Sequence, residues 1–199
     1  MGGTEADLTQ SDRPVISIAG EQVALGPTTP ELLPLVLRWR SDFEVTRTLA
    51  ARWRLTSRHA VETWYDAFRQ HDHGFMIYER ETLRPIGFAT LMDIDHLMRT
   101  AELALVIGEK DYWGKGYGTE ATTLMLDYAF TWIHLHSVKL RVFAHNERGL
   151  RAYQRAGFKL IGRWREAYRI GDRALDVIFM DCLATEFRSP VLRRFLPDE

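Results

Sequence analysis

The sequence predicts a single α/β domain of the α+β class, in which a central mixed, mostly antiparallel twisted sheet of about seven strands is flanked by helices. Short runs rich in β-branched and aromatic residues are joined by tight turns, which is typical of antiparallel hairpins. Longer segments between them carry apolar residues at helical spacing. The 199 residues, of which 46% are hydrophobic, provide apolar material for one core and not for two.

The N-terminal residues 1–14 are polar and contain no apolar core, so they predict a disordered leader rather than a signal peptide. We expect the folded domain to span 15–187 and a C-terminal tail to occupy 188–199. No stretch of the sequence approaches the length of a membrane span, so we expect no membrane partner and a cytoplasmic location. The first strand is predicted at Gln22–Leu25, where Gly26-Pro27 ends it.

Three helices are predicted after this strand. Thr28 or Thr29 provides an N-cap for the first helix, and Pro30 suits its first turn. A second, short helix is expected at 41–45. The third helix follows an N-cap at Ser57, and its buried stripe is formed by Val61, Trp64, Tyr65 and Phe68.

The remaining elements alternate between strands and helices. They are a strand at 74–79, a strand at 85–93, a strand at 100–107, a helix at 116–135, a strand at 138–144, a helix at 147–156 and a final hairpin at 158–183 that turns at Gly171-Asp172. Strands show a period of two residues and helices a period near 3.6, which separates the two kinds of element.

The most informative segment joins the strand at 100–107 to the helix that follows. It contains three glycines within five residues, Gly114, Gly116 and Gly118. Glycine lets the backbone approach a ligand closely, and the first turn of a helix leaves N–H groups unpaired. These donors and the positive end of the helix dipole suit phosphate oxygens. The segment predicts an anion-binding loop, although a tight connection without a ligand would use the same glycines.

Two common nucleotide-binding motifs do not fit this loop. A P-loop needs Ser or Thr after Gly-Lys, whereas Gly114-Lys115 is followed by Gly116. The dinucleotide-binding pattern needs a third glycine where Thr119 stands, and no acidic residue on a following strand suggests a ribose partner.

A second motif lies at 142–158, where a strand ends in Asn146 and a short helix carries Tyr153 and closes in Gly157-Phe158. Together the two motifs resemble the GNAT superfamily of acyl-CoA-dependent N-acetyltransferases. That family has a loop of the form Arg/Gln-x-x-Gly-x-Gly/Ala, and this chain has Trp113 at the first position. The amino-acid sequence of the loop is most similar to that of the branch containing ribosomal-protein alanine N-acetyltransferases and spermidine N-acetyltransferases. The resemblance covers 22–183.

The resemblance implies a GNAT fold that is splayed around an acetyl-CoA site. It implies transfer of an acetyl group from acetyl-CoA to a primary amine by direct attack within a ternary complex, without a metal. The backbone of a splayed strand would pair with pantetheine, and the glycine loop would hold the pyrophosphate. The residues expected to bind the cofactor are Leu105, Val106, Ile107, Trp113, Gly114, Lys115, Gly116, Tyr117, Gly118, Thr119 and Asn146. Asn146 would also suit an N-cap, and Gly149 stands where many members carry Ser or Ala.

Two catalytic residues are predicted. Tyr153 is assigned as the general acid, because the family places this hydroxyl near the cofactor sulfur and a phenol with a pKa of about 10 matches a thiolate leaving group. Without the resemblance, a tyrosine packed in the core would be the simpler interpretation. Glu102 could take the proton of the amine directly or through a water, but it could equally pair with an arginine.

The acceptor is the least determined part of the prediction. Asp93 and Asp95 could attract a cationic amine, although solvated loop carboxylates would look the same in sequence. Arginines at 38, 40, 47, 52 and 54 argue against a uniformly acidic pocket. Three alternatives stay open: an acetyltransferase for protein N-termini, one for polyamines or amine-bearing antibiotics, and a catalytically silent acyl-CoA-binding module. A homodimer through the final hairpin is possible.

Composition excludes other classes of partner and chemistry. The net charge of −1 offers no polycationic field for nucleic acid. The single cysteine, Cys182, lies in an apolar run and is expected to be buried and inert. The pair His71 and His73 lacks the spacing and the further ligands of a metal site.

Overall fold

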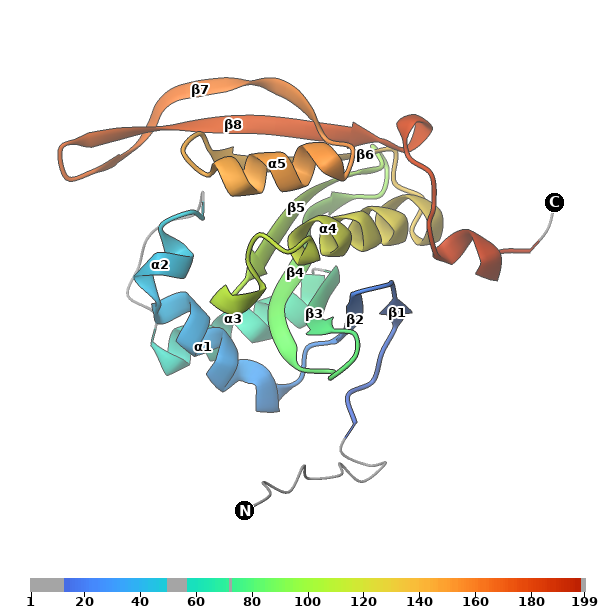
Figure 1. Cartoon of the computed structure of the whole chain (residues 1–199). Coiled ribbons are helices and arrows are strands. Elements are labelled where there is room, and N and C mark those ends of the chain that lie inside the picture. The colour runs from blue at the N-terminus through green and yellow to red at the C-terminus, as the bar shows by residue number, and fades with distance from the viewer. Residues whose placement is uncertain (1–12, 50–56, 72, 198–199) are drawn as a thin grey trace, which may run out of the picture.

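A computed structural model describes residues 13–49, 57–71 and 73–197, without the side chains of 67–71. Eight strands in this part of the chain form one sheet in the order β1-β2-β3-β4-β5-β6-β8-β7. They are β1 (Ile18–Ala19), β2 (Val23–Pro27), β3 (His73–Glu79), β4 (Pro85–Asp95), β5 (Thr100–Ile107), β6 (Ser137–Phe143), β7 (Lys159–Ile170) and β8 (Arg173–Leu183). Neighbouring strands are antiparallel except for β5 and β6, which are parallel (Figure 1). The predicted fold class is confirmed, with β1 as the strand that the sequence did not reveal.

The helices are α1 (Leu33–Ser41), α2 (Phe43–Thr46), α3 (Arg58–His71), α4 (Tyr117–Asp127) and α5 (Glu147–Arg155), with a short 3-10 turn at Pro30–Leu32 before α1. Ser57 caps α3 as predicted, since its Oγ accepts a hydrogen bond from the N–H of Ala60 at 3.1 Å. Asp42, rather than Ser41, caps α2, because its carboxylate accepts from the N–H of Glu44 at 2.8 Å. The Thr29 side chain makes no capping bond.

The helix predicted at 116–135 changes its geometry partway. Regular α-helix ends at Asp127, and a π-helical turn, η3, continues from Tyr128 to Trp132. The carboxylate of Asp127 is fully buried and accepts hydrogen bonds from the N–H groups of Val191 and Leu192, both at 2.9 Å. Part of the segment predicted as a tail is therefore packed against the core.

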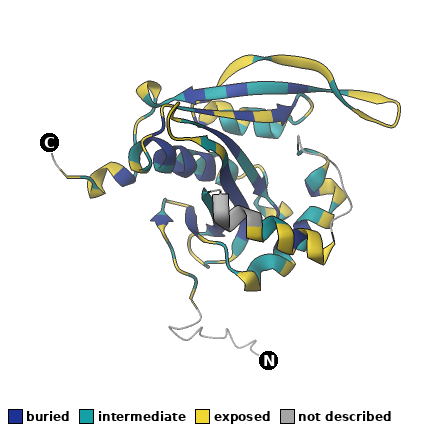
Figure 2. Cartoon of the chain, turned by 180° about the vertical axis from the view of Figure 1, so that it is seen from behind, coloured by how far each residue is buried: buried dark blue, intermediate teal, exposed yellow. Residues whose placement is uncertain are grey.

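The sheet carries helices on both faces. One face packs against α4, and its core includes Leu91 and Leu103. The other face packs against α1, α2 and α3, and its core includes Trp39, Phe88 and Val106. Buried residues concentrate in the middle strands and in α4 (Figure 2). The leader predicted at 1–14 lies almost wholly outside the described residues, and no described helix has the length and hydropathy to span a membrane.

The parallel pair of strands separates soon after it begins. Pairing between β5 and β6 is confined to three positions, from Thr100↔Ser137 to Glu102↔Lys139. Beyond them, β5 continues beside β4, whereas β6 continues beside β8. The sheet therefore opens between β5 and β6, as predicted, and α5 lies beside the opening (Figure 1).

The final hairpin extends beyond the rest of the molecule (Figure 1). Its outer strand, β7, is a sheet edge and exposes Leu160, Ile161 and Trp164. Val177, on β8, is buried inside the hairpin's own packing. Apolar side chains on an unpaired edge are compatible with the predicted homodimer, which stays a prediction.

Candidate active site

A pocket of about 480 Å³ lies where β5 and β6 separate. Its walls come from both faces of the sheet. Leu105, Ile107 and Tyr153 belong to the core on the α4 face, whereas Phe88 and Trp64 belong to the core beneath α1–α3. The pocket therefore passes through the sheet instead of lying on one side of it.

The exposed backbone of β5 forms one wall. The N–H of Gly108 donates to the carbonyl of Ile86, on the β4 side, at 2.8 Å. Backbone groups alternate along a strand, so Val106 also faces β4, while Leu105 and Ile107 face the opening. Leu105 and Ile107 thus lie where the sequence predicts the contacts to pantetheine. Val106 differs from the prediction, because it contributes a side chain to the pocket while its backbone faces β4.

The glycine loop forms the end of the pocket next to α4. Gly114 and Gly116 have φ values of 76° and 98°, a left-handed conformation that favours glycine. Gly116 occupies the N-cap position of α4, and no side chain caps this end. The N–H groups of the first turn, including those of Gly118 and Thr119, therefore lack helix partners and can bind an anion.

Two residues of the predicted cofactor set lie outside the pocket. The Lys115 side chain is exposed, and Tyr117 packs edge to face against Tyr112 with ring centroids 5.0 Å apart. Glu120, one turn into α4, accepts hydrogen bonds from the N–H of Gln22 at 3.0 and 3.1 Å. These contacts fix the position of the helix start relative to the sheet.

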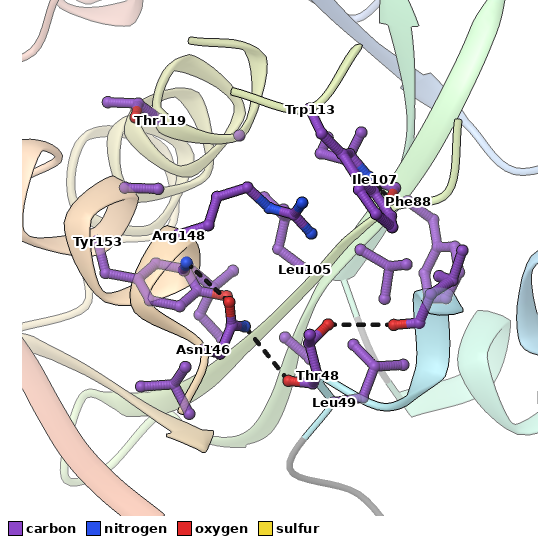
Figure 3. A pocket seen from close by; sticks show the side chains of 18 of the residues that line it. Thr48, Leu49, Phe88, Leu105, Ile107, Trp113, Thr119, Asn146, Arg148 and Tyr153 are labelled. Atoms are coloured by element: carbon purple, nitrogen blue, oxygen red, sulfur yellow. Dashed lines mark hydrogen bonds between the residues drawn. The ribbon is translucent and has the colours of Figure 1, made fainter. Parts of the chain in front are cut away.

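Trp113 and Arg148 connect the loop to α5. The indole N–H of Trp113 donates to the carbonyl of Ile107 at 2.8 Å. The Arg148 guanidinium lies 3.8 Å from the centre of the indole ring, which is a close cation–π contact. Figure 3 shows Arg148 crossing the pocket from α5 toward Trp113. Burial, followed by the charge of Arg47, lowers the pKa of Arg148.

The sequence analysis did not identify a row of arginines on α5. Arg148, Arg151 and Arg155 all line the pocket, and spacings of three and four residues put them on one face of the helix. Arginine forks bind phosphate oxygens in pairs. The spacing of these arginines was a readable signal, since they follow the predicted cap at Asn146.

Tyr153 projects from α5 into the pocket (Figure 3). Its ring packs edge to face against Phe158, with centroids 6.0 Å apart. Desolvation raises the pKa of Tyr153 to about 12. The hydroxyl is therefore protonated at neutral pH, as a general acid must be.

Asn146 caps α5 and also reaches across the pocket. Its Oδ1 accepts from the N–H of Gly149 at 2.9 Å, which is the predicted cap. Its Nδ2 donates to the carbonyl of Thr48, just after α2, at 3.3 Å (Figure 3). A Cβ at position 149 would lie 2.6 Å from Nδ2, so Gly149 leaves room for this side chain.

Glu102 has the arginine partner that was one of the two roles the sequence left open, whereas its role as the base stays a prediction. It lines the pocket and is 6% exposed. Its Oε1 accepts from Nε of Arg141 at 2.6 Å, and its Oε2 lies 3.9 Å from Nζ of Lys139. One carboxylate oxygen is thus held by an arginine, and the other is the one available to a water or an amine.

Asp93 and Asp95 do not line the pocket. Both are exposed near the end of β4, and Asp95 accepts a hydrogen bond from the N–H of Met98 at 2.8 Å. On the α1–α3 face the pocket is lined instead by residues that the sequence did not single out as substrate contacts, namely Arg40, Thr48, Leu49, Trp64, Phe88, Thr90 and Met92. They come from four separate segments, so no local pattern marks them.

Cys182 does not contribute to the pocket. Cys182 is 1% exposed and outside the pocket, and burial raises the pKa of its thiol to about 11. This agrees with the predicted inert thiol. Among the described residues, no three His, Cys, Asp or Glu side chains are grouped closely enough to hold a metal ion.

Comparison with known proteins gives one matching family model, described as an acetyltransferase (GNAT) domain, over residues 22–159. The spermidine N(1)-acetyltransferase of Vibrio cholerae is 25% identical over 155 residues, which cover 76% of this chain and 89% of the relative. The Escherichia coli K12 enzyme of the same name is 33% identical over 94 residues, 47% of this chain and 50% of the relative. The structure of spermidine N-acetyltransferase from Vibrio cholerae in complex with CoA and spermine superimposes with a TM-score of 0.76 at 23% identity, covering 83% of this chain and 97% of the other.

Proposed function

The chain belongs to the GNAT family of acetyl-CoA-dependent N-acetyltransferases, and we propose that its acceptor is the primary amine of a small molecule. The observation that carries this proposal is the pocket that passes through the sheet. One end offers backbone donors and arginines that suit phosphates, and the other is enclosed by side chains from α1, α2 and α3. A donor and an acceptor can therefore meet inside the sheet, as direct attack within a ternary complex requires.

Acetyl-CoA supplies the acetyl group as a thioester. The residues of this chain position the thioester and protonate the sulfur that leaves. Leu105 and Ile107 present backbone groups for pantetheine, while the N–H groups at the start of α4 bind the pyrophosphate together with arginines of α5. Tyr153 Oη holds the proton that the leaving sulfur takes. The amine must lose a proton to attack, and Glu102 Oε2 is the carboxylate oxygen that can receive it.

Among the predicted acceptors, the relatives favour a polyamine over a protein N-terminus. Their names state spermidine as the substrate, and the Vibrio cholerae relative matches this chain over 89% of its own length. Trp64 and Leu49 give this end of the pocket an apolar wall, which suits the carbon chain of a small acceptor. Polyamines are therefore the reference acceptors, and a peptide N-terminus is the second candidate.

The position of Tyr153 argues against a silent binding module, since a protein that only binds acyl-CoA has no need for a protonated phenol inside its pocket. Release of free thiol from acetyl-CoA tests the proposal with polyamines, other small amines and N-terminal peptides as acceptors. We expect turnover with at least one small amine and none with peptides. Calorimetric binding of acetyl-CoA without turnover of any amine would instead support the silent module.

A further inference from the structure

The pocket wall on the α1–α3 face, which we call the acceptor half, contains a cation that has no carboxylate partner among the described residues. Arg40, at the end of α1, is half-buried and lines the pocket beside Trp64. Its guanidinium carbon lies 5.6 Å from the centroid of the Trp64 ring. Within the described residues, Arg40 forms no ion pair with a carboxylate, and burial lowers its pKa without a contribution from any neighbouring charge.

Three other cations near this site have described partners. Arg38, on the same helix, pairs with Glu109 outside the pocket. Arg141 pairs with Glu102, and Arg148 stacks on Trp113 in the cofactor half. Arg40 differs from Arg38 and Arg141 because it has no carboxylate partner among the described residues, and it differs from Arg148 because it lies beside Trp64 on the α1–α3 face of the pocket.

The carboxylates near the site do not balance this charge. Glu102 is the only acidic residue among the described residues that line the pocket, and it already holds Arg141. Asp42 and Glu44 lie outside the pocket and pair with Lys110 at 3.0 and 2.9 Å. The acceptor half therefore has more positive than negative charge before any ligand binds.

The charge of Arg40 determines which amines fit. A guanidinium in a partly desolvated, aromatic surrounding is stabilised by an anion, and its planar fork matches the two oxygens of a carboxylate. A polycation would instead bring further positive charge toward Arg40. On the basis of the proposed function, we infer that the acceptor is a primary amine that also carries a carboxylate, which Arg40 binds while Trp64 and Phe88 contact the carbon chain between the two groups.

The geometry of the strands indicates the length of this acceptor. Phe88, Thr90 and Met92 lie on one face of β4, where Phe88 is opposite Val106 and Met92 is opposite Glu102. Four residues of strand span about 13 Å. Arg40 lies with Trp64 and Phe88 at one end of this row, and Glu102 lies at the other. A carboxylate at the first end thus directs the amine toward Glu102 and the opening of the sheet.

Matched pairs of amines test the inference. We would measure kcat/KM by thiol release for γ-aminobutyrate against butylamine and for ε-aminocaproate against hexylamine, with spermidine as the polycation. We expect the carboxylate member of at least one pair to be favoured roughly 10- to 100-fold, as for a hydrogen bond to a charged group. Arg40→Gln should remove that preference by raising KM for the carboxylate member alone, and Arg40→Lys should retain part of it.

Arg38→Gln serves as the matched control, because it removes one charge from the same helix outside the pocket and should leave the preference unchanged. Acetyl-CoA binding and Tm, measured for each variant, show that a lost preference does not come from a damaged fold. If the decarboxylated amines or spermidine are the better acceptors of the unmodified chain, the inference is wrong, although the proposed function stands. If no small amine is acetylated while acetyl-CoA binds, both are wrong. If Arg40→Gln unfolds the chain, Arg40→Lys decides: a reduced preference for the carboxylate member supports the inference, and an unchanged preference overturns it.

Discussion

The half of the pocket on the α4 face is formed largely by backbone, whereas the half on the α1–α3 face is formed by side chains. Leu105, Ile107 and the glycines at 114–118 present N–H and C=O groups whose positions depend on strand separation and on left-handed φ values. Arg40, Trp64 and Phe88, by contrast, act through charge and aromatic surface. Backbone recognition suits a donor shared by many enzymes, and side-chain recognition suits an acceptor that differs between them.

Tyr153→Phe should have the largest effect, because Tyr153 serves the reaction and not the binding of either substrate. We expect kcat to fall about 100-fold or more, as for loss of a general acid, with the Kd of acetyl-CoA within about twofold. In the unmodified enzyme, a Tyr153 pKa of about 12 means that raising the pH from neutral toward 10 should not remove the acid. Stopped assays across this pH range would measure both effects. An unchanged kcat in the phenylalanine variant would contradict the assignment.

Glu102→Gln tests the residue at the border between the two halves. Glutamine keeps the shape of the side chain but cannot accept a proton, so we expect kcat/KM to fall at least about tenfold and its dependence on pH below neutral to change. A pH-rate profile of both enzymes measures this. Lys139→Gln, which removes the cation 3.9 Å from Oε2, should keep the profile of the unmodified enzyme. If Glu102→Gln lowers Tm without altering the profile, Glu102 is structural.

Gly116→Ala should weaken the cofactor half alone. A side chain at a φ of 98° costs about 1–2 kcal/mol, so the loop must change its backbone, and we expect the Kd of acetyl-CoA to rise about tenfold. The KM of the acceptor should change little. Gly162→Ala, on β7, is the control, because nothing lies within 4 Å of the added Cβ and the position is outside the pocket. Equal loss of affinity for both substrates would show that the two halves are not independent.

Gly149→Ala should have the smallest effect. It acts on the hydrogen bond from Asn146 to Thr48, which links the two halves of the pocket. The new methyl group displaces Asn146 and its hydrogen bond to Thr48, which should raise the acceptor KM about twofold to fivefold. Loss of the cap costs about 1 kcal/mol, but replacing glycine in a helix regains a similar amount, so Tm should stay nearly constant. Asn146→Ala has no such compensation and should lower Tm. A fall in acetyl-CoA affinity instead of acceptor affinity would contradict this assignment of the link.

The same difference explains what the sequence could predict. Local spacing along the chain was enough to identify the glycines at 114–118, Asn146 and Tyr153. The strands and helices around them are found within a few residues of the expected bounds. Arg40, Trp64 and Phe88 meet only because α1, α3 and β4 pack together, and no spacing along the chain records that contact. Asp93 and Asp95 illustrate the opposite error, since a suitable charge in the sequence said nothing about its distance from the pocket, and both residues lie exposed near the end of β4.

The opening between β5 and β6 has a consequence for the order of events in a catalytic cycle. Because the walls of the pocket come from both faces of the sheet, the proposed function has the donor and the acceptor approach from opposite sides. Neither has to pass through the space that the other occupies. The fold thus imposes no order on substrate binding or product release. Any kinetic preference for one order must come from movements of side chains such as Arg148, which crosses the pocket.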